Sequence, residues 1–153
     1  MEYKGIAFER HWSMPNHQTF KIKAFDKLIK SELGNAYIDP FPYPFKQDAI
    51  DYLKAIPNRS ENYLVFDPPY SQRQPKEMYA SEGLAFNHPM NNSYWANCRK
   101  EISRIIKPGG KVISFGWNTN GIGKKFGFEI KKIVIVAHGS QHNDTMATVE
   151  VKA

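Results

Sequence analysis

Residues 63–70 have the sequence YLVFDPPY, a short apolar run followed by a carboxylate and two prolines. A continuous apolar run of this length is typical of a strand buried on both faces of an α/β sheet. In open α/β sheets, ligands bind beyond the carboxyl ends of the strands, which is where Phe66 is followed by Asp67. The segment therefore predicts a buried strand that delivers Asp67 to a ligand-binding edge.

Residues 67–70 suit chemistry on the amino group of a nucleic-acid base. Asp67 offers a carboxylate that can accept an N–H, and the rigid Pro68-Pro69 pair fixes the carbonyl of Pro68 as a second acceptor. Tyr70 offers an aromatic face on which an extruded base can stack. A plain proline-rich turn, in which Asp67 only caps the strand, is the alternative interpretation.

The flanking sequence alternates between helix and strand patterns. Apolar positions at helical spacing predict helices at about 23–33, 47–55 and 92–106, and Gly34 is expected to end the first of them. Short apolar runs predict strands at 36–38, 111–115, 130–137 and 145–151. This order indicates an α/β fold whose sheet is covered by helices on both faces.

The composition fits one globular domain. The 153 residues form a single unit, 1–153, which is too short for an additional target-recognition domain. Lys and Arg number 21 against 15 Asp and Glu, and the net charge of +6 favours a polyanionic partner such as DNA or RNA. A single cysteine, Cys98, excludes an intramolecular disulfide. Neither a signal core nor a membrane span is recognisable, so we expect a cytoplasmic protein with no membrane partner.

The DPPY sequence at 67–70 is similar to motif IV of the amino-methyltransferases, which modify base amines in DNA and in some RNAs. Further segments make the chain resemble the small adenine-specific DNA methyltransferases carried by bacteriophages and mobile elements. These segments are 12–16 (WSMPN), 66–74 (FDPPYSQRQ), 106–111 (IKPGGK), 114–118 (SFGWN) and 137–145 (AHGSQHNDT).

The resemblance implies a Rossmann-like methyltransferase sheet whose last strand is antiparallel, a role that residues 145–151 fit, and S-adenosylmethionine as the cofactor. It implies methyl transfer to the exocyclic amino group of adenine in DNA, in the cytoplasm of a bacterium or phage-infected cell. The catalytic segment would be Asp67, Pro68, Pro69 and Tyr70. The cofactor-binding residues would be Phe20, Asp39, Phe41, Asp48 and Asp67.

One segment departs from the family. Only eight residues separate Ile38 from Gln47, fewer than the dozen or so that a parallel crossover needs. The helix and second strand that normally follow the first strand therefore cannot lie here, and the sheet is shortened in its cofactor-binding half. Two interpretations stay open: a minimal methyltransferase with a rebuilt cofactor pocket, or a nucleic-acid-binding or decoy homologue that binds cofactor weakly. An enzyme acting on RNA or on cytosine is a further alternative.

Several basic residues are predicted to contact nucleic acid. Arg73, Lys124 and Lys125 are candidates for phosphate contacts, with Tyr70 beneath the base; an ordinary solvated surface is the alternative for the three cations. His138 and His142 lack a third ligand, so we expect no metal site but a loop that shapes the pocket. The chain is expected to be a monomer or a homodimer.

Overall fold

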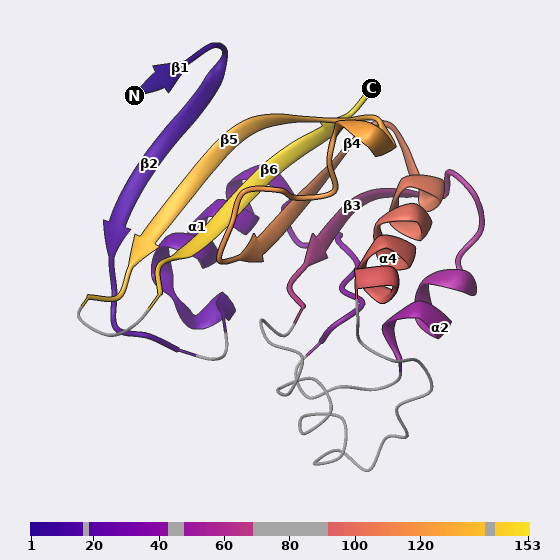
Figure 1. Ribbon diagram of the computed structural model, residues 1–153, viewed down its shortest axis with the longest axis horizontal. Coiled ribbons are helices and arrows are strands. Elements are labelled where there is room, and N and C mark those ends of the chain that lie inside the picture. The colour runs from indigo at the N-terminus through magenta and orange to yellow at the C-terminus, as the bar shows by residue number, and fades with distance from the viewer. Residues whose placement is uncertain (17–18, 43–47, 69–91, 140–142) are drawn as a thin grey trace.

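The computed structural model describes residues 1–16, 19–42, 48–68, 92–139 and 143–153. Within these ranges the chain forms a six-stranded sheet in the order β1-β2-β5-β6-β4-β3 (Figure 1). The strands are β1 Glu2–Tyr3, β2 Ile6–Trp12, β3 Glu61–Phe66, β4 Ile106–Gly116, β5 Phe128–Ala137 and β6 Thr145–Lys152. The helices are η1 Thr19–Lys21, α1 Lys23–Glu32, α2 Ala49–Lys54, α4 Asn92–Ile105 and η2 Lys124–Phe126.

The strand directions bring four strand ends to one edge of the sheet. β2 is parallel to β5 and β3 is parallel to β4, whereas β6 runs antiparallel to both β4 and β5. β2, β3, β4 and β5 therefore all end on the same side, as their arrowheads show in Figure 1. We call this side the carboxyl edge; it holds Trp12, Asp67, Gly116 and Ala137. The opposite side, where β3 and β4 begin and β6 ends, is the amino edge.

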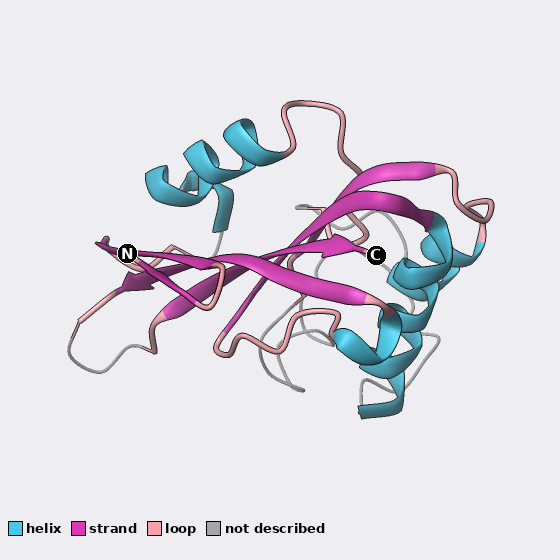
Figure 2. Ribbon diagram, turned by 90° about the horizontal axis from the view of Figure 1, so that it is seen from above, coloured by secondary structure: helices cyan, strands magenta, loops and turns pink. Residues whose placement is uncertain are grey.

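Helices cover both faces of the sheet (Figure 2). Side chains of a strand alternate between its faces, and β3 shows this clearly. Val65 packs in the hydrophobic cluster formed with α1, while Leu64 and Phe66 pack in the cluster formed with α2 and α4. The predicted α/β class, with two covered faces and an antiparallel last strand, is confirmed.

The N-terminal strands were not predicted from the sequence. Residues 6–12 pair in parallel with β5, from Ala7 opposite Lys132 to Trp12 opposite Ala137. The outer half of this strand, from Glu9 onward, is exposed, so the buried apolar alternation that marks a strand is missing there. The pattern therefore shows a polar, aromatic stretch where the structure has a strand near the end of the sheet.

The strand predicted at 36–38 is reduced to a single bridge between Ile38 and Leu64. Its two backbone hydrogen bonds run from Ile38 N to Tyr63 O and from Val65 N to Ile38 O. Pro40 follows two residues later and has no N–H to continue the ladder. This bridge is all that the described residues contribute to the sheet beyond β3, in keeping with a shortened cofactor-binding half.

The helices match the predicted positions with small shifts. α1 ends where Gly34 adopts a left-handed conformation (φ 69°), as expected. α2 begins one residue after Asp48, and α4 passes directly into β4, which starts at Ile106 and not at Lys111. Within the described ranges, no helix is long and apolar enough to cross a membrane.

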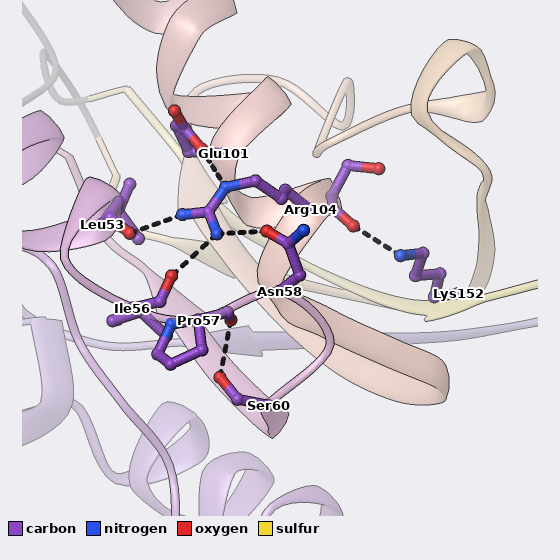
Figure 3. Close-up of polar contacts among 9 residues, drawn as sticks. Leu53, Ile56, Pro57, Asn58, Ser60, Glu101, Arg104 and Lys152 are labelled. Atoms are coloured by element: carbon purple, nitrogen blue, oxygen red, sulfur yellow. Dashed lines mark hydrogen bonds and ion pairs between the residues drawn. The ribbon is translucent and has the colours of Figure 1, made fainter.

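Arg104, near the end of α4, fastens the end of α2 at the amino edge (Figure 3). Its guanidinium donates to the backbone carbonyls of Leu53 (2.9 Å) and Ile56 (2.7 Å), and to the side chain of Asn58 (2.7 Å). Glu101, one turn earlier on α4, forms an ion pair with Arg104 Nε. Arg104 thus supplies a donor to the carbonyl of Ile56 and a further donor to the carbonyl of Leu53, which also accepts from the N–H of Ile56 (3.1 Å).

Candidate active site at the carboxyl edge

Asp67 lies directly after β3 at the carboxyl edge and is partly buried. Thr19, in η1, donates a hydrogen bond from its Oγ1 to Asp67 Oδ1 at 3.1 Å, across 48 residues of sequence. Thr19 is itself buried, so this bond holds one carboxylate oxygen in a fixed direction. No role was predicted for Thr19 from the sequence; its only signal was its position next to Phe20.

The rest of the predicted catalytic segment is described only in part. Pro68 is partly buried and follows Asp67 at the same edge. Pro69, Tyr70 and Arg73 lie outside the described residues, so their predicted roles stay predictions. The site can therefore be built from the strand end and from the elements that surround it.

Phe20 lies beside the ends of β3 and β4. Its ring packs against Phe115 of β4 (5.8 Å between ring centroids) and against Tyr37, just before the Ile38 bridge (6.4 Å). Since Thr19 is bonded to Asp67, the short helix η1 places two neighbouring side chains at this edge. The predicted cofactor residue Phe20 and the predicted catalytic residue Asp67 are thus brought together.

Asp39 follows the Ile38 bridge, next to the end of β3. Its Oδ1 accepts a hydrogen bond from the backbone N–H of Phe41 at 2.9 Å. Burial disfavours the charged form and raises the pKa of this carboxyl to about 7, although the N–H of Phe41 opposes the shift. No described residue donates to its other oxygen, so Asp39 offers an acceptor at the carboxyl edge.

The other two predicted cofactor residues, Phe41 and Asp48, serve the fold in the contacts that the structure describes. Phe41 is buried between Phe66 and Trp95, with ring centroids 6.0 Å from each. Asp48 is the N-cap of α2 and accepts hydrogen bonds from the N–H groups of Ile50 (2.9 Å) and Asp51 (3.4 Å). Phe41 and Asp48 therefore have structural roles in the core and in the helix cap, and their contact with a cofactor stays a prediction.

Lys124 and Lys125 do not lie near Asp67. Both are exposed in η2, just before β5 begins, and Phe128 of β5 pairs with Lys152 at the amino edge (Figure 1). Ser103, near the end of α4, donates a hydrogen bond to Phe126 O (2.8 Å) and fixes η2 there. The two lysines and Asp67 therefore belong to opposite edges, and phosphate contacts by these lysines would be remote from Asp67.

His138, which follows β5, forms hydrogen bonds with residues next to β2 and at the start of β6, at the carboxyl edge. Its Nδ1 lies 2.9 Å from Ser13 O and its Nε2 lies 2.8 Å from Thr145 Oγ1. Because a carbonyl only accepts, Nδ1 is the donor, and in the neutral ring Nε2 accepts from the threonine hydroxyl. Both ring nitrogens are thus engaged, and the parts of the chain that are described contain no group of three or more metal-ligand side chains.

No family model and no curated protein matches the chain. Among solved structures, the chain is similar to TTHA0409 from Thermus thermophilus, a candidate DNA modification methylase. The identity is 16% over 69% of this chain and 50% of that one, and the TM-score is 0.45. The complex of the same protein with S-adenosyl-L-methionine has 17% identity, coverage of 69% and 51%, and a TM-score of 0.45.

The chain is also similar to TrmN from Thermus thermophilus, with 14% identity over 97% of this chain and 45% of that one, and a TM-score of 0.44. A candidate type 11 methyltransferase from Sulfolobus solfataricus has 14% identity, coverage of 97% and 85%, and a TM-score of 0.41. The chain spans about half the length of the TTHA0409 structures that it matches.

Proposed function

We propose that the protein transfers a methyl group from S-adenosylmethionine to the exocyclic amino group of adenine in DNA. The observation that carries this proposal is the Thr19–Asp67 hydrogen bond, which holds a partly buried carboxylate at the carboxyl edge. A carboxylate held in this way accepts an N–H in a defined direction, as methylation of a base amine requires. The DPPY sequence and the positive net charge support the same conclusion.

In the proposed reaction, the base turns away from its neighbours in the strand and presents its amino group to Asp67 and to the carbonyl oxygen of Pro68. Each of these acceptors takes one N–H, so the nitrogen lone pair points away from both. S-adenosylmethionine, when bound, supplies a methyl group on a positively charged sulfur. Asp67 holds the amine for attack, and its negative charge stabilises the positive charge that develops on the nitrogen until a proton is released.

Phe20 and Asp39 would hold the cofactor, and both fit it. The cofactor carries an ammonium group and hydroxyl donors, and Asp39 has a carboxylate oxygen that accepts from no described residue. The raised pKa of Asp39 means that this carboxyl gains from a cationic or hydrogen-bond-donating neighbour. Phe20 is partly exposed at the same edge and offers an apolar wall.

The first test is binding of S-adenosylmethionine to the purified protein by calorimetry. Micromolar affinity supports the proposal, and an Asp39→Asn variant should bind more weakly while remaining folded. The absence of binding at millimolar ligand would contradict it.

The second test is transfer of a labelled methyl group to adenine-containing DNA. Asp67→Ala should lower kcat at least about 100-fold, since removing one group that stabilises developing charge has an effect of this size. Thr19→Val should lower kcat by about 10-fold, because Asp67 loses the donor that orients it, and Thr19→Ser should restore most of the rate. Substantial activity in Asp67→Ala would rule out its proposed role.

A nucleic-acid-binding protein without methyl transfer is the second candidate. It is favoured by the engagement of Phe41 and Asp48 in the core and in a helix cap, and by the single bridge at Ile38. Salt-sensitive DNA binding without cofactor binding would support this candidate over the enzyme. Offering adenine and cytosine, in DNA and in RNA, separates the remaining substrates.

A further inference from the structure

Large apolar side chains are exposed at two places in the described part of the chain. Met1 and Tyr3 lie at the N-terminus, whereas Trp12, Met14 and Trp117 lie at the carboxyl edge that also holds Asp67. Trp12 is 66% exposed and Trp117 is 47% exposed. Exposure of two indoles at one edge costs hydrophobic free energy that a binding partner recovers.

The backbone around Trp12 is held firmly although its indole is exposed. Trp12 ends the ladder with β5, and the next residue donates from Ser13 N to Ala137 O at 3.0 Å. Ser13 O is bonded to the ring of His138. Gly139 lies against the indole, since a Cβ on Gly139 would be 3.5 Å from Trp12 Nε1. An aromatic side chain fixed in this way loses little conformational entropy when it binds.

A cation accompanies Trp12 on the same face of β2. Arg10 lies two residues earlier, so its side chain points to the same side at a distance of about 7 Å along the strand. Arg10 is exposed, and no described residue forms an ion pair with it, whereas Glu9 on the opposite face pairs with His11 and Lys132. An indole beside an unpaired guanidinium matches a base beside its phosphate.

The spacing of the strands gives the distance along the carboxyl edge from Trp117 to Trp12. Neighbouring strands lie about 4.8 Å apart, so the three steps from β4 to β2 span about 14 Å. Trp117 follows the end of β4, and Asp67 follows the end of β3, one step further along. A single strand with its target base at Asp67 can therefore cross the ends of β4, β5 and β2 and the start of β6.

We propose that the carboxyl edge binds an unpaired DNA strand by stacking bases on Trp117 and Trp12, with Arg10 contacting a phosphate. This inference rests on the proposed function for the base at Asp67 and adds the path of the flanking nucleotides. Stacking on an aromatic side chain is independent of sequence, so the surface accommodates any flanking bases. Target choice then depends on the groups around Asp67 and not on these contacts.

The test is binding of a labelled single-stranded DNA of about 12 nucleotides to the full chain, followed by fluorescence anisotropy. Trp12→Ala and Trp117→Ala should each weaken binding about 5- to 100-fold, and Trp12→Phe should retain most of the affinity. Tyr3→Ala is the matched control, because Tyr3 is 64% exposed but lies at the opposite end of β2. Its Kd should equal that of the wild type.

Salt dependence separates the stacking contacts from the phosphate contact. Arg10→Ala should lower the slope of log Kd against log salt by about 0.7, whereas Trp12→Ala should leave the slope unchanged. Lys27→Ala, an exposed cation on α1, is the control for Arg10 and should have no effect. RNA of the same sequence, offered in parallel, distinguishes the two nucleic acids; tighter binding of RNA would overturn the assignment to DNA.

Different results would refute DNA stacking at the carboxyl edge and methyl transfer at Asp67. Equal Kd values for Trp12→Ala and Tyr3→Ala, or no binding of DNA by the wild type, would overturn the proposed surface even if the protein binds S-adenosylmethionine. Weaker binding in both tryptophan variants, in a protein that binds no cofactor, would uphold the surface and refute methyl transfer.

Discussion

At the amino edge, the guanidinium of Arg104 donates to three acceptors and pairs with Glu101, whereas at the carboxyl edge Asp39 keeps an oxygen that accepts from no described residue. Lys152 likewise caps two carbonyls at the amino edge, those of Ser103 and Ile106. The exposed indoles Trp12 and Trp117 occur at the carboxyl edge. The amino edge thus uses these polar groups to stabilise the fold, whereas at the carboxyl edge one oxygen of Asp39 is open to a ligand.

The largest loss of stability is expected from Arg104→Ala at the amino edge. The variant removes the donor to the carbonyl of Ile56 and one donor to the carbonyl of Leu53, and it leaves Glu101 without its ion pair, which should lower the free energy of unfolding by about 2–4 kcal/mol. For a chain of this size, the Tm should fall by roughly 5–15 °C. Denaturant and thermal unfolding measure both quantities.

Lys100→Ala, on the exposed side of the same helix, is the control for Arg104 and should stay within about 0.5 kcal/mol of the wild type. Cofactor affinity at a temperature where both proteins are folded should not change. Lower affinity in a fully folded Arg104→Ala protein would show that the two edges are not independent.

At the carboxyl edge, Asp39 should make stability depend on pH. Burial raises its pKa from 3.8 to about 7, so the folded protein holds this proton more tightly than the unfolded chain. The contribution is fully present below about pH 4 and is lost as the pH rises through 7, by up to about 4 kcal/mol. The difference in unfolding free energy between wild type and Asp39→Asn, measured from pH 4 to 8.5, should show this loss.

Cofactor binding should reverse part of that loss, because a cation or donor beside Asp39 favours its charged form. At pH 7 the free protein is about half protonated at Asp39, so binding should release up to about half a proton. Calorimetry in buffers of different ionisation enthalpy detects this release. Its absence in a protein that binds S-adenosylmethionine would place the cofactor away from Asp39.

The same substitution in the first half of β4 and at its end should have different effects. A Cβ on Gly110 would lie 2.6 Å from Ile106 Cγ2 and 2.8 Å from Asn62 O, so Gly110→Ala should cost about 1–3 kcal/mol. A Cβ on Gly116 would meet nothing within 4 Å, and Gly116→Ala should change stability by less than about 0.5 kcal/mol. Equal losses in urea unfolding would contradict the packed amino edge and open carboxyl edge.

The elements with a buried apolar pattern could be predicted from the sequence, and the others could not. Residues 63–66 are apolar because β3 is covered on both faces, and they correctly predicted a buried strand. Residues 6–12 form a strand whose outer half is exposed, so its position depends on hydrogen bonds to β5 and not on its own composition. The reduction of residues 36–38 to one bridge also depends on a tertiary contact.

In the candidate site, too, the sequence predicted only what a local pattern carries. A local motif predicted Asp67 at a strand end, but its partner Thr19 is 48 residues away, and only the fold brings η1 to that edge. The placement of Lys124 and Lys125 at the other edge follows from the strand directions, which a cluster of charges does not reveal. Composition predicts a polyanionic partner but does not indicate which edge such a partner would contact.

The smallest effect is expected from a Lys124→Ala/Lys125→Ala double variant, which tests whether nucleic acid reaches the amino edge. β6 crosses the sheet in eight residues, so the two edges are about 25 Å apart. A strand of about six nucleotides bound at Trp12 and Trp117 does not reach η2, so the double variant should bind this strand with the same Kd as the wild type.

A duplex of about 30 base pairs can reach η2, so the slope of log Kd against log salt for the duplex should fall by up to about 1.8 in the double variant. A weaker Kd for the short strand would mean that nucleic acid follows a path outside the carboxyl edge, whereas an unchanged slope for the duplex would remove both lysines from the contacts.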